Sequence, residues 1–340
     1  MFESLTLRLN ERTVVLNRFL SICDLCDEVA SNAEGALFSE ISRRANLSAN
    51  LREEKIFRHC AIVNQLYSIY EAFAEAVLGV WLSRLPHYKL FDELPNGFKN
   101  SYRCGIARII QDSEKRKYRH VSLIDVLDRY LSSLRGETPW EFVGEALIAH
   151  DRNLRRSELE QLFHSAGLIG VWSALERNPA ITCLTVYGDS NKSLEQMILD
   201  LVTYRNDASH GTPDEILGID TLREWIVFVK AFCESLASFI AHRIGNEQAL
   251  SMPETVYGVV TETFRNNIAI IKCDRGIIRE GEYLYFLRDA DCTRARINSI
   301  QVNDVNQDSV EIKHEGFEVG IQTSVKVPRS SRVLKINDFL

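Results

Sequence analysis

The chain has 340 residues, of which 45% are hydrophobic and 26% charged, and its formal net charge is −7. This length suits two domains, or one large domain with a small one, and the composition is ordinary for a soluble globular protein. The negative charge argues against a protein that coats nucleic acid over its whole surface, although it allows a local basic cleft.

The sequence predicts a cytoplasmic protein with no membrane partner. No stretch approaches about 18 uninterrupted apolar residues, and no basic segment followed by an apolar run marks the N-terminus as a secretion signal. The eight cysteines are scattered, mostly within apolar periodic segments, as reduced core thiols are. Cys23 and Cys26 have the spacing of a zinc or redox pair, but no second pair matches them, so a core role is favoured.

Two long helices are predicted in the first part of the chain. Residues 1–30 and 52–85 carry apolar side chains at helical spacing, and a small, polar stretch at 31–35 interrupts the pattern. The segment 86–99 contains two prolines and a glycine and is predicted to be a loop.

Between residues 102 and 135, basic residues outnumber acidic ones. The densest part is the local candidate for contact with an RNA backbone, and its tyrosine is available to stack on a base. A charge run is more often a solvated helix face, so this alternative stays open. The candidate RNA-binding residues here are Lys115, Arg116, Lys117, Tyr118 and Arg119.

A second polar segment begins at His150 and continues as Asp-Arg-Asn-Leu-Arg-Arg. Asn153, Arg155 and Arg156 are placed either to line a cleft that binds RNA or to cap and solvate the start of a helix. His150 and His164 have no partner that the sequence identifies, and neither is assigned a catalytic role.

Residues 193–211 combine an apolar helical stripe with three polar side chains at its end, namely Arg205, Asn206 and His210. Gly211 is expected to stop this helix, with Pro213 beyond it. Arginine is permanently charged and binds phosphate oxygens, whereas histidine moves protons near neutral pH. Such a pair is sufficient to cleave RNA without a metal: the 2′-hydroxyl attacks the neighbouring phosphorus, His210 moves protons and Arg205 neutralises the developing charge.

This run, Arg205-Asn206-Asp-Ala-Ser-His210, resembles the Arg-Asn-x-x-x-His signature of the larger HEPN-domain ribonucleases of bacterial defence and toxin systems. The resemblance implies an all-α helical bundle whose ribonuclease site is formed by Arg205 and His210, with Asn206 as a polar companion. The segment around Glu71 and the segment from His150 also resemble parts of these families, and Glu71 is interpreted as structural.

Five residues turn about 500° in a straight helix, which leaves Arg205 and His210 roughly 140° apart. The resemblance implies a remedy, because two HEPN copies usually pair and build one composite cleft, so a homodimer is expected. A smaller HEPN toxin is silenced by adenylylation of a tyrosine two places beyond the histidine; Thr212 occupies that place, which disfavours this variant.

A further core helix is predicted over 213–244, followed by a linker at 245–253. Period-two alternation then predicts a small closed barrel. Its expected strands are 256–262, 268–272, 282–287, 294–302, 309–312, 323–327 and 332–336.

The barrel resembles the second domain of Tu-type translation elongation factors. The resemblance is carried by Gly258-Val-Val and by the segments 276–282, 295–304, 316–321 and 327–328. It implies contact with the ribosome or tRNA. The sequence contains no Gly-x4-Gly-Lys-Ser/Thr loop, so GTP hydrolysis is not favoured and no cofactor is expected.

The sequence thus predicts an α+β multidomain protein, with a HEPN-like helical domain at 1–248 and a β-barrel at 254–340. The leading hypothesis is a metal-independent endoribonuclease of a defence or toxin system that works as a homodimer. The alternative is a non-catalytic HEPN-like scaffold that binds RNA, nucleotide or protein. RNA is the expected partner, and an antitoxin or other regulatory protein is a further candidate partner.

Overall fold

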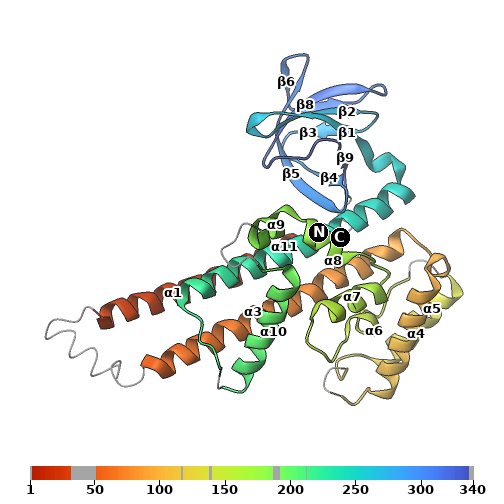
Figure 1. Cartoon of the computed structure of the whole chain (residues 1–340). Coiled ribbons are helices and arrows are strands. Elements are labelled where there is room, and N and C mark those ends of the chain that lie inside the picture. The colour runs from red at the N-terminus through yellow and green to blue at the C-terminus, as the bar shows by residue number, and fades with distance from the viewer. Residues whose placement is uncertain are drawn as a thin grey trace.

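A helical part and an all-β part make up the chain, and they meet at the end of one long helix (Figure 1). The computed structural model describes residues 2–31, 51–115, 118–137, 140–186, 192–211 and 213–336. The predicted α+β organisation, a helical region followed by a barrel, is confirmed.

Among the described residues, the helical part contains three long helices and several short ones. The long helices are α1 (Glu3–Ser31), α3 (Leu51–Arg84) and α11 (Ile219–Ser251), and the first two agree with the predicted ranges. The shorter helices that the structure describes are α4 (Asn96–Gln111), α5 (Leu123–Arg135), α6 (Glu145–Ile148), α7 (Arg156–Ser165), α8 (Val171–Arg177), α9 (Pro179–Val186) and α10 (Leu194–Ser209). The predicted loop at 86–99 contains the 3-10 turns Leu85–His87 and Phe91–Glu93, and α4 begins before the predicted loop ends.

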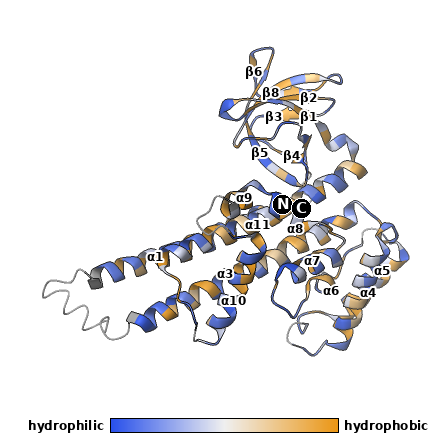
Figure 2. Cartoon of the chain, viewed as in Figure 1, coloured by the Kyte–Doolittle hydropathy of each residue, from blue (hydrophilic) through white to orange (hydrophobic). Residues whose placement is uncertain are grey.

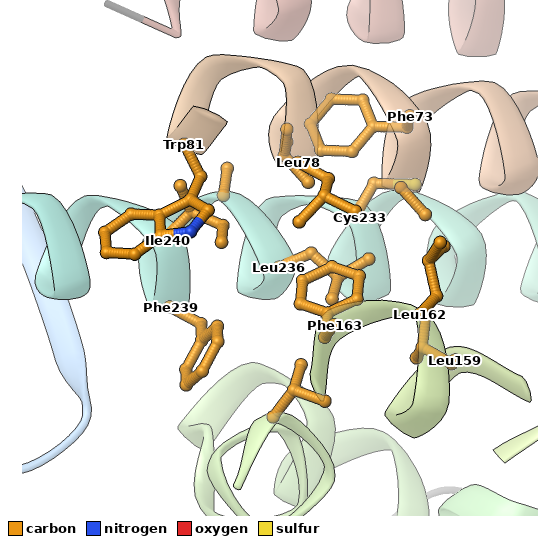
Figure 3. Packing of buried hydrophobic residues seen from close by; sticks show 14 of the residues in the cluster. Phe73, Leu78, Trp81, Leu159, Leu162, Phe163, Cys233, Leu236, Phe239 and Ile240 are labelled. Atoms are coloured by element: carbon orange, nitrogen blue, oxygen red, sulfur yellow. The ribbon is translucent and has the colours of Figure 1, made fainter. Parts of the chain in front are cut away.

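The helical core is built where α3, α7 and α11 pack together (Figure 3). Phe73, Leu78 and Trp81 of α3 face Leu236 and Ile240 of α11, and all five are buried. Figure 2 shows how hydrophobic positions recur along these helices while polar positions take the remaining faces. Helix α11 is long and apolar enough to cross a membrane, but 72% of its most apolar window is buried inside the protein, as in a core helix.

The predicted linker at 245–253 is wrong, because α11 continues through it to Ser251. Gly245 lies against the barrel, where an added Cβ would be 2.7 Å from a side-chain carbon of Leu287. Gln248 is buried and donates a hydrogen bond of 2.8 Å to the carbonyl of Lys335. The helix continues because the barrel supplies partners for its last turns, which local composition does not reveal.

The all-β part is a closed barrel. Its strands are β1 (Val256–Thr263), β2 (Ile268–Cys273), β3 (Ile277–Arg279), β4 (Tyr283–Arg288), β5 (Asp291–Val302), β6 (Val305–Gln307), β7 (Ser309–Glu311), β8 (Phe317–Thr323) and β9 (Arg332–Leu334). The hydrogen-bonded order β4-β9-β1-β2-β8-β5 closes through a β4–β5 pairing. In addition, β6 pairs with β5, and β3 pairs with β7. Closure pairs the edges that an open sheet would leave exposed.

One predicted strand, 323–327, is wrong: the strand is β8, which ends at Thr323. Residues 317–323 alternate between buried and more exposed positions, and Ile321 pairs with Ala269 of β2. Beyond the strand, the Thr323 hydroxyl lies 2.8 Å from the carbonyl of Val325, to which it donates. The chain therefore turns away from the sheet where the sequence pattern predicted its continuation.

Candidate functional site

The motif residues lie at the C-terminal end of α10. Ser193 caps the start of this helix by accepting a hydrogen bond from the backbone N–H of Gln196, and Leu194, Ile198 and Leu201 bury its apolar stripe. Gly211 ends it with φ +74°, a left-handed conformation that glycine adopts without strain. The predicted stop at Gly211 is thus observed.

Arg205 points toward α3. Its guanidinium carbon lies 5.0 Å from the centre of the Tyr67 ring, and its Nη1 donates a hydrogen bond of 3.2 Å to Oδ1 of Asn206. Among the residues that the structure describes, no carboxylate forms an ion pair with Arg205. Its positive charge is therefore positioned by an aromatic face and an amide but is not neutralised.

Asn206 connects α10 to the segment before α7. Its Oδ1 also accepts a hydrogen bond of 3.0 Å from Nδ2 of Asn153. The next residue, Leu154, is fixed by two buried tyrosines: its N–H donates to the Tyr67 hydroxyl at 2.9 Å, and its carbonyl accepts from the Tyr70 hydroxyl at 2.9 Å. Asn153 therefore lies beside the motif, as one of its two sequence interpretations requires.

His210 forms the C-cap of α10, and its side chain is exposed. Within the described part of the chain, no hydrogen bond or ion pair joins its ring to Arg205. The neighbouring Ser209 hydroxyl donates to the Arg205 carbonyl at 2.8 Å and lies 3.4 Å from Oδ1 of Asn64 on α3. One copy of the chain thus brings together Arg205, Asn206 and Asn153, while His210 faces solvent.

A polar row on α3 lies under this site and was missed in the sequence. Tyr67, Glu71 and Glu75 are spaced four residues apart, which places them on one helix face. The Tyr67 hydroxyl donates a hydrogen bond of 3.0 Å to Glu71, in agreement with a structural role for this carboxylate. The spacing was available as a signal, but nothing in the sequence indicates that α10 packs on this row.

Glu75 in turn lies 3.2 Å from Nε2 of His150, whose Nδ1 is 2.8 Å from the carbonyl of Arg152. The Glu75 carboxylate raises the pKa of His150 above its ordinary value, against the opposing effect of burial. The sequence identified no partner for His150, and the structure shows that it contacts Glu75 of the polar row.

The candidate RNA-binding residues at 115–119 follow α4, in the segment that leads to α5. Lys115 pairs with Asp112 at 2.9 Å, and Nε of Arg119 donates to the carbonyl of Glu114 at 3.1 Å; both side chains are exposed. The prediction for Tyr118 is wrong, because this residue is 2% exposed and belongs to the helical core, where no base can stack on its ring. The remaining two candidates, Arg116 and Lys117, lie outside the described residues.

Arg155 and Arg156 flank the start of α7 and differ in their surroundings. Arg155 is the exposed N-cap residue. Arg156 lies 2.6 Å from Glu195 and 3.4 Å from Glu160, and its guanidinium carbon is 5.3 Å from the centre of the Trp172 ring. Two carboxylates thus compensate the charge of Arg156, which favours the structural interpretation for this residue.

Comparison with known proteins identifies the helical part. The family model described as RiboL-PSP-HEPN matches residues 34–242, which is more than half of the chain. No curated protein matches the chain. Among solved structures, the C-terminal domain of a putative U32 peptidase from Geobacillus thermoleovorans is similar, with 19% identity and a TM-score of 0.22, over 24% of this chain and 93% of that domain.

The Tu-type resemblance of the barrel is not confirmed by these comparisons and stays a prediction. The helical resemblance has a firmer basis, since the matched residues contain α3, α10 and the complete Arg205–His210 motif. By this match, the chain belongs to the RiboL-PSP-HEPN family.

Proposed function

We propose that this protein is a metal-independent endoribonuclease of a defence or toxin system, with Arg205 and His210 as its catalytic pair. HEPN domains are commonly ribonucleases or nucleotide-binding modules, which supports the class of activity. The observation that carries the proposal is the guanidinium of Arg205, which has no carboxylate partner among the described residues and lies over Tyr67 at the helix end that also carries the exposed His210.

This arrangement suits attack by a 2′-hydroxyl on the adjacent phosphodiester. Arg205 would bind the phosphoryl oxygens, whose negative charge grows in the transition state. His210 would take the proton from the 2′-hydroxyl or give one to the leaving 5′-oxygen. Asn206 accepts from both Arg205 and Asn153, and so would keep the guanidinium in one orientation.

A second copy of the chain would complete the site. Arg205 is directed toward α3 while His210 faces outward, so the two side chains of one copy do not converge on one phosphate. Two exposed histidines related by a two-fold axis would lie on either side of a shared cleft. Exposed apolar side chains of α1, Leu7, Val15 and Ile22, provide surface for such pairing.

The proposed setting is the cytoplasm, with RNA as partner, no membrane partner, and an antitoxin or other regulatory protein as a further candidate partner. The barrel would direct the helical part to its RNA or to that protein. All eight cysteines, each within the described residues, are free thiols, which agrees with a reducing compartment.

Incubation of total bacterial RNA with the protein in EDTA tests the proposal. The wild type should yield fragments ending in 2′,3′-cyclic phosphate, and Arg205→Ala or His210→Ala should each lower the rate about 100-fold or more. His164→Ala is the matched control, because His164 is also exposed near the C-terminal end of a helix, α7, and should cleave at the wild-type rate.

A non-catalytic scaffold is the second candidate, because Asn206 and Arg205 also join α10 to α3 and to Asn153. In a scaffold, Arg205→Ala would lower the melting temperature or abolish RNA or partner binding. If the wild type leaves the RNA intact and the variant shows such a loss, the ribonuclease hypothesis is refuted and the scaffold hypothesis is supported.

A further inference from the structure

A cleft of about 610 Å³ lies between α4, α6 and α7, beside the segment that leads to Asn153. Its size is within the range of small-ligand sites, about 300–1,000 Å³. One wall is a face of α4, where Asn100, Cys104 and Arg108 are spaced four residues apart. His150 and Arg152 contribute to the rim, and buried Leu147 and Leu162 supply apolar surface.

The charges around this cleft suit a nucleotide. Among the described residues, the exposed guanidinium groups of Arg108 and Arg152 form no ion pair, so both are available to a phosphate. The carboxylates of Asp151 and Glu158 and the amides of Asn100 and Gln161 also line the cleft, and they offer the acceptors and donors that a base edge requires. Acid and base together favour a ligand with both an anionic group and hydrogen-bonding edges over a simple polyanion.

The cleft and the motif are linked through one short segment. His150 lines the cleft and contacts Glu75, whereas Asn153, three residues later, donates to Asn206. Three residues span at most about 10 Å, even in an extended chain. A single strand of RNA whose scissile phosphate lies at Arg205 would therefore reach the cleft within a few nucleotides.

We propose that this cleft binds one unpaired nucleotide of the RNA next to the scissile bond, with its phosphate between Arg108 and Arg152 and its base against Leu147 and Leu162. This inference rests on the proposed ribonuclease function. The shared chemistry is that of a nucleoside monophosphate, which the cleft could receive from an RNA chain or as a free nucleotide.

Cys104 provides a local readout, since this exposed free thiol lines the cleft. The full-length protein is alkylated with iodoacetamide, alone or with a short single-stranded 2′-O-methyl oligonucleotide, which cannot undergo 2′-hydroxyl attack. Mass spectrometry follows Cys104 and, as internal control, the exposed Cys183 of α9, outside the cleft. Nucleoside 5′-monophosphates form the second arm.

We expect the oligonucleotide to slow the alkylation of Cys104 at least fivefold and to leave Cys183 unchanged. Arg108→Gln and Arg152→Gln should each abolish this protection, whereas Arg12→Gln on the exposed face of α1 should retain it. Equal alkylation with and without oligonucleotide would overturn the proposal. Protection by mononucleotides but not by the oligonucleotide would overturn the RNA source and assign the cleft to a free nucleotide.

Cleavage of unmodified RNA, measured in parallel, separates this inference from the proposed function. Cleavage without protection of Cys104 would refute the nucleotide site in the cleft and leave the proposed ribonuclease activity standing. Protection without cleavage would support a nucleotide site in the cleft of a binding protein and refute the proposed ribonuclease activity.

Discussion

Arg205 and Arg156 illustrate how the surroundings of one residue type separate a structural from a functional role. Both guanidinium groups lie over an aromatic ring, at 5.0 Å from the centre of Tyr67 for Arg205 and 5.3 Å from that of Trp172 for Arg156. Arg156 also has two carboxylate partners, whereas Arg205 has an amide. A cation that lacks a carboxylate retains more of its affinity for an incoming anion.

Tyr67→Phe should lower the free energy of unfolding by about 1–3 kcal/mol, because the buried N–H of Leu154 loses its acceptor. The ring under Arg205 is retained, so the change isolates the hydroxyl group. Urea unfolding measures the loss. Tyr283→Phe, at an exposed tyrosine of β4, is the control and should change stability by less than about 0.5 kcal/mol. Equal stability of the two variants would show that the Tyr67–Leu154 bond contributes nothing.

At the scale of elements, the wall of the cleft depends on the close approach of α4 and α6. Gly105 makes this approach possible, because a Cβ added there would lie 1.8 Å from the carbonyl oxygen of Ala146. Gly97 belongs to the same helix, yet a Cβ added there would meet nothing within 4 Å. The two glycines therefore have different reasons to occur in one helix.

Gly105→Ala should destabilise the protein by at least about 2 kcal/mol, since the contact involves backbone that has to shift. Gly97→Ala should be neutral or stabilising by up to about 1 kcal/mol, because alanine loses less entropy than glycine in a helix. Thermal unfolding of both variants tests this difference. A Gly105→Ala protein that melts at the wild-type temperature would contradict the close packing.

Helical periodicity was sufficient to predict α1, α3 and the motif helix α10, and period-two alternation predicted most of the barrel strands, because both patterns record which face is buried. Tyr118 was misjudged because its charged neighbours describe the surface of the turn, while its own ring folds inward. The pairs Asn153–Asn206 and Glu75–His150 were beyond reach, since tertiary packing alone brings these distant residues together.

At the scale of the whole molecule, α11 joins the two parts into one structure. Tyr285, Leu287 and Leu334 of the barrel are buried in the same hydrophobic cluster as the helices. Asn246 of α11 accepts from Arg332 of β9, and the Ser238 hydroxyl donates to the Cys292 carbonyl at 3.0 Å. We therefore expect the helical part and the barrel to unfold together.

His242 lies at this junction and is 7% exposed. Burial and, to a smaller extent, the charges of Arg243 and Arg332 together lower its pKa to about 4, against the weaker opposing effect of Asp291. The unfolded chain, with an ordinary pKa near 6.5, binds more protons between these two values. The contribution of neutral His242 to the free energy of unfolding is thus fully present above about pH 6.5, and it is lost as the pH falls toward 4.

Lowering the pH from 7.5 to 5 should therefore cost the wild type up to about 2 kcal/mol more than His242→Gln, at roughly 1.4 kcal/mol per pKa unit. Urea unfolding of both proteins at the two pH values gives this difference. The contributions of the carboxylates to the pH dependence are common to both proteins and cancel in the comparison. Identical pH dependence of the two proteins would refute a buried, neutral His242.

The length of α11 also sets a distance. Its 33 residues correspond to about 50 Å, with the segment from His210 entering at one end and the barrel packed against the other (Figure 1). The barrel contacts α11 from Ser238 onward, 19 residues or about 29 Å along the helix from Ile219. A molecule that touches the barrel and the start of α11 at once has to bridge about that distance. Extended or folded macromolecules meet that requirement, and small ligands do not.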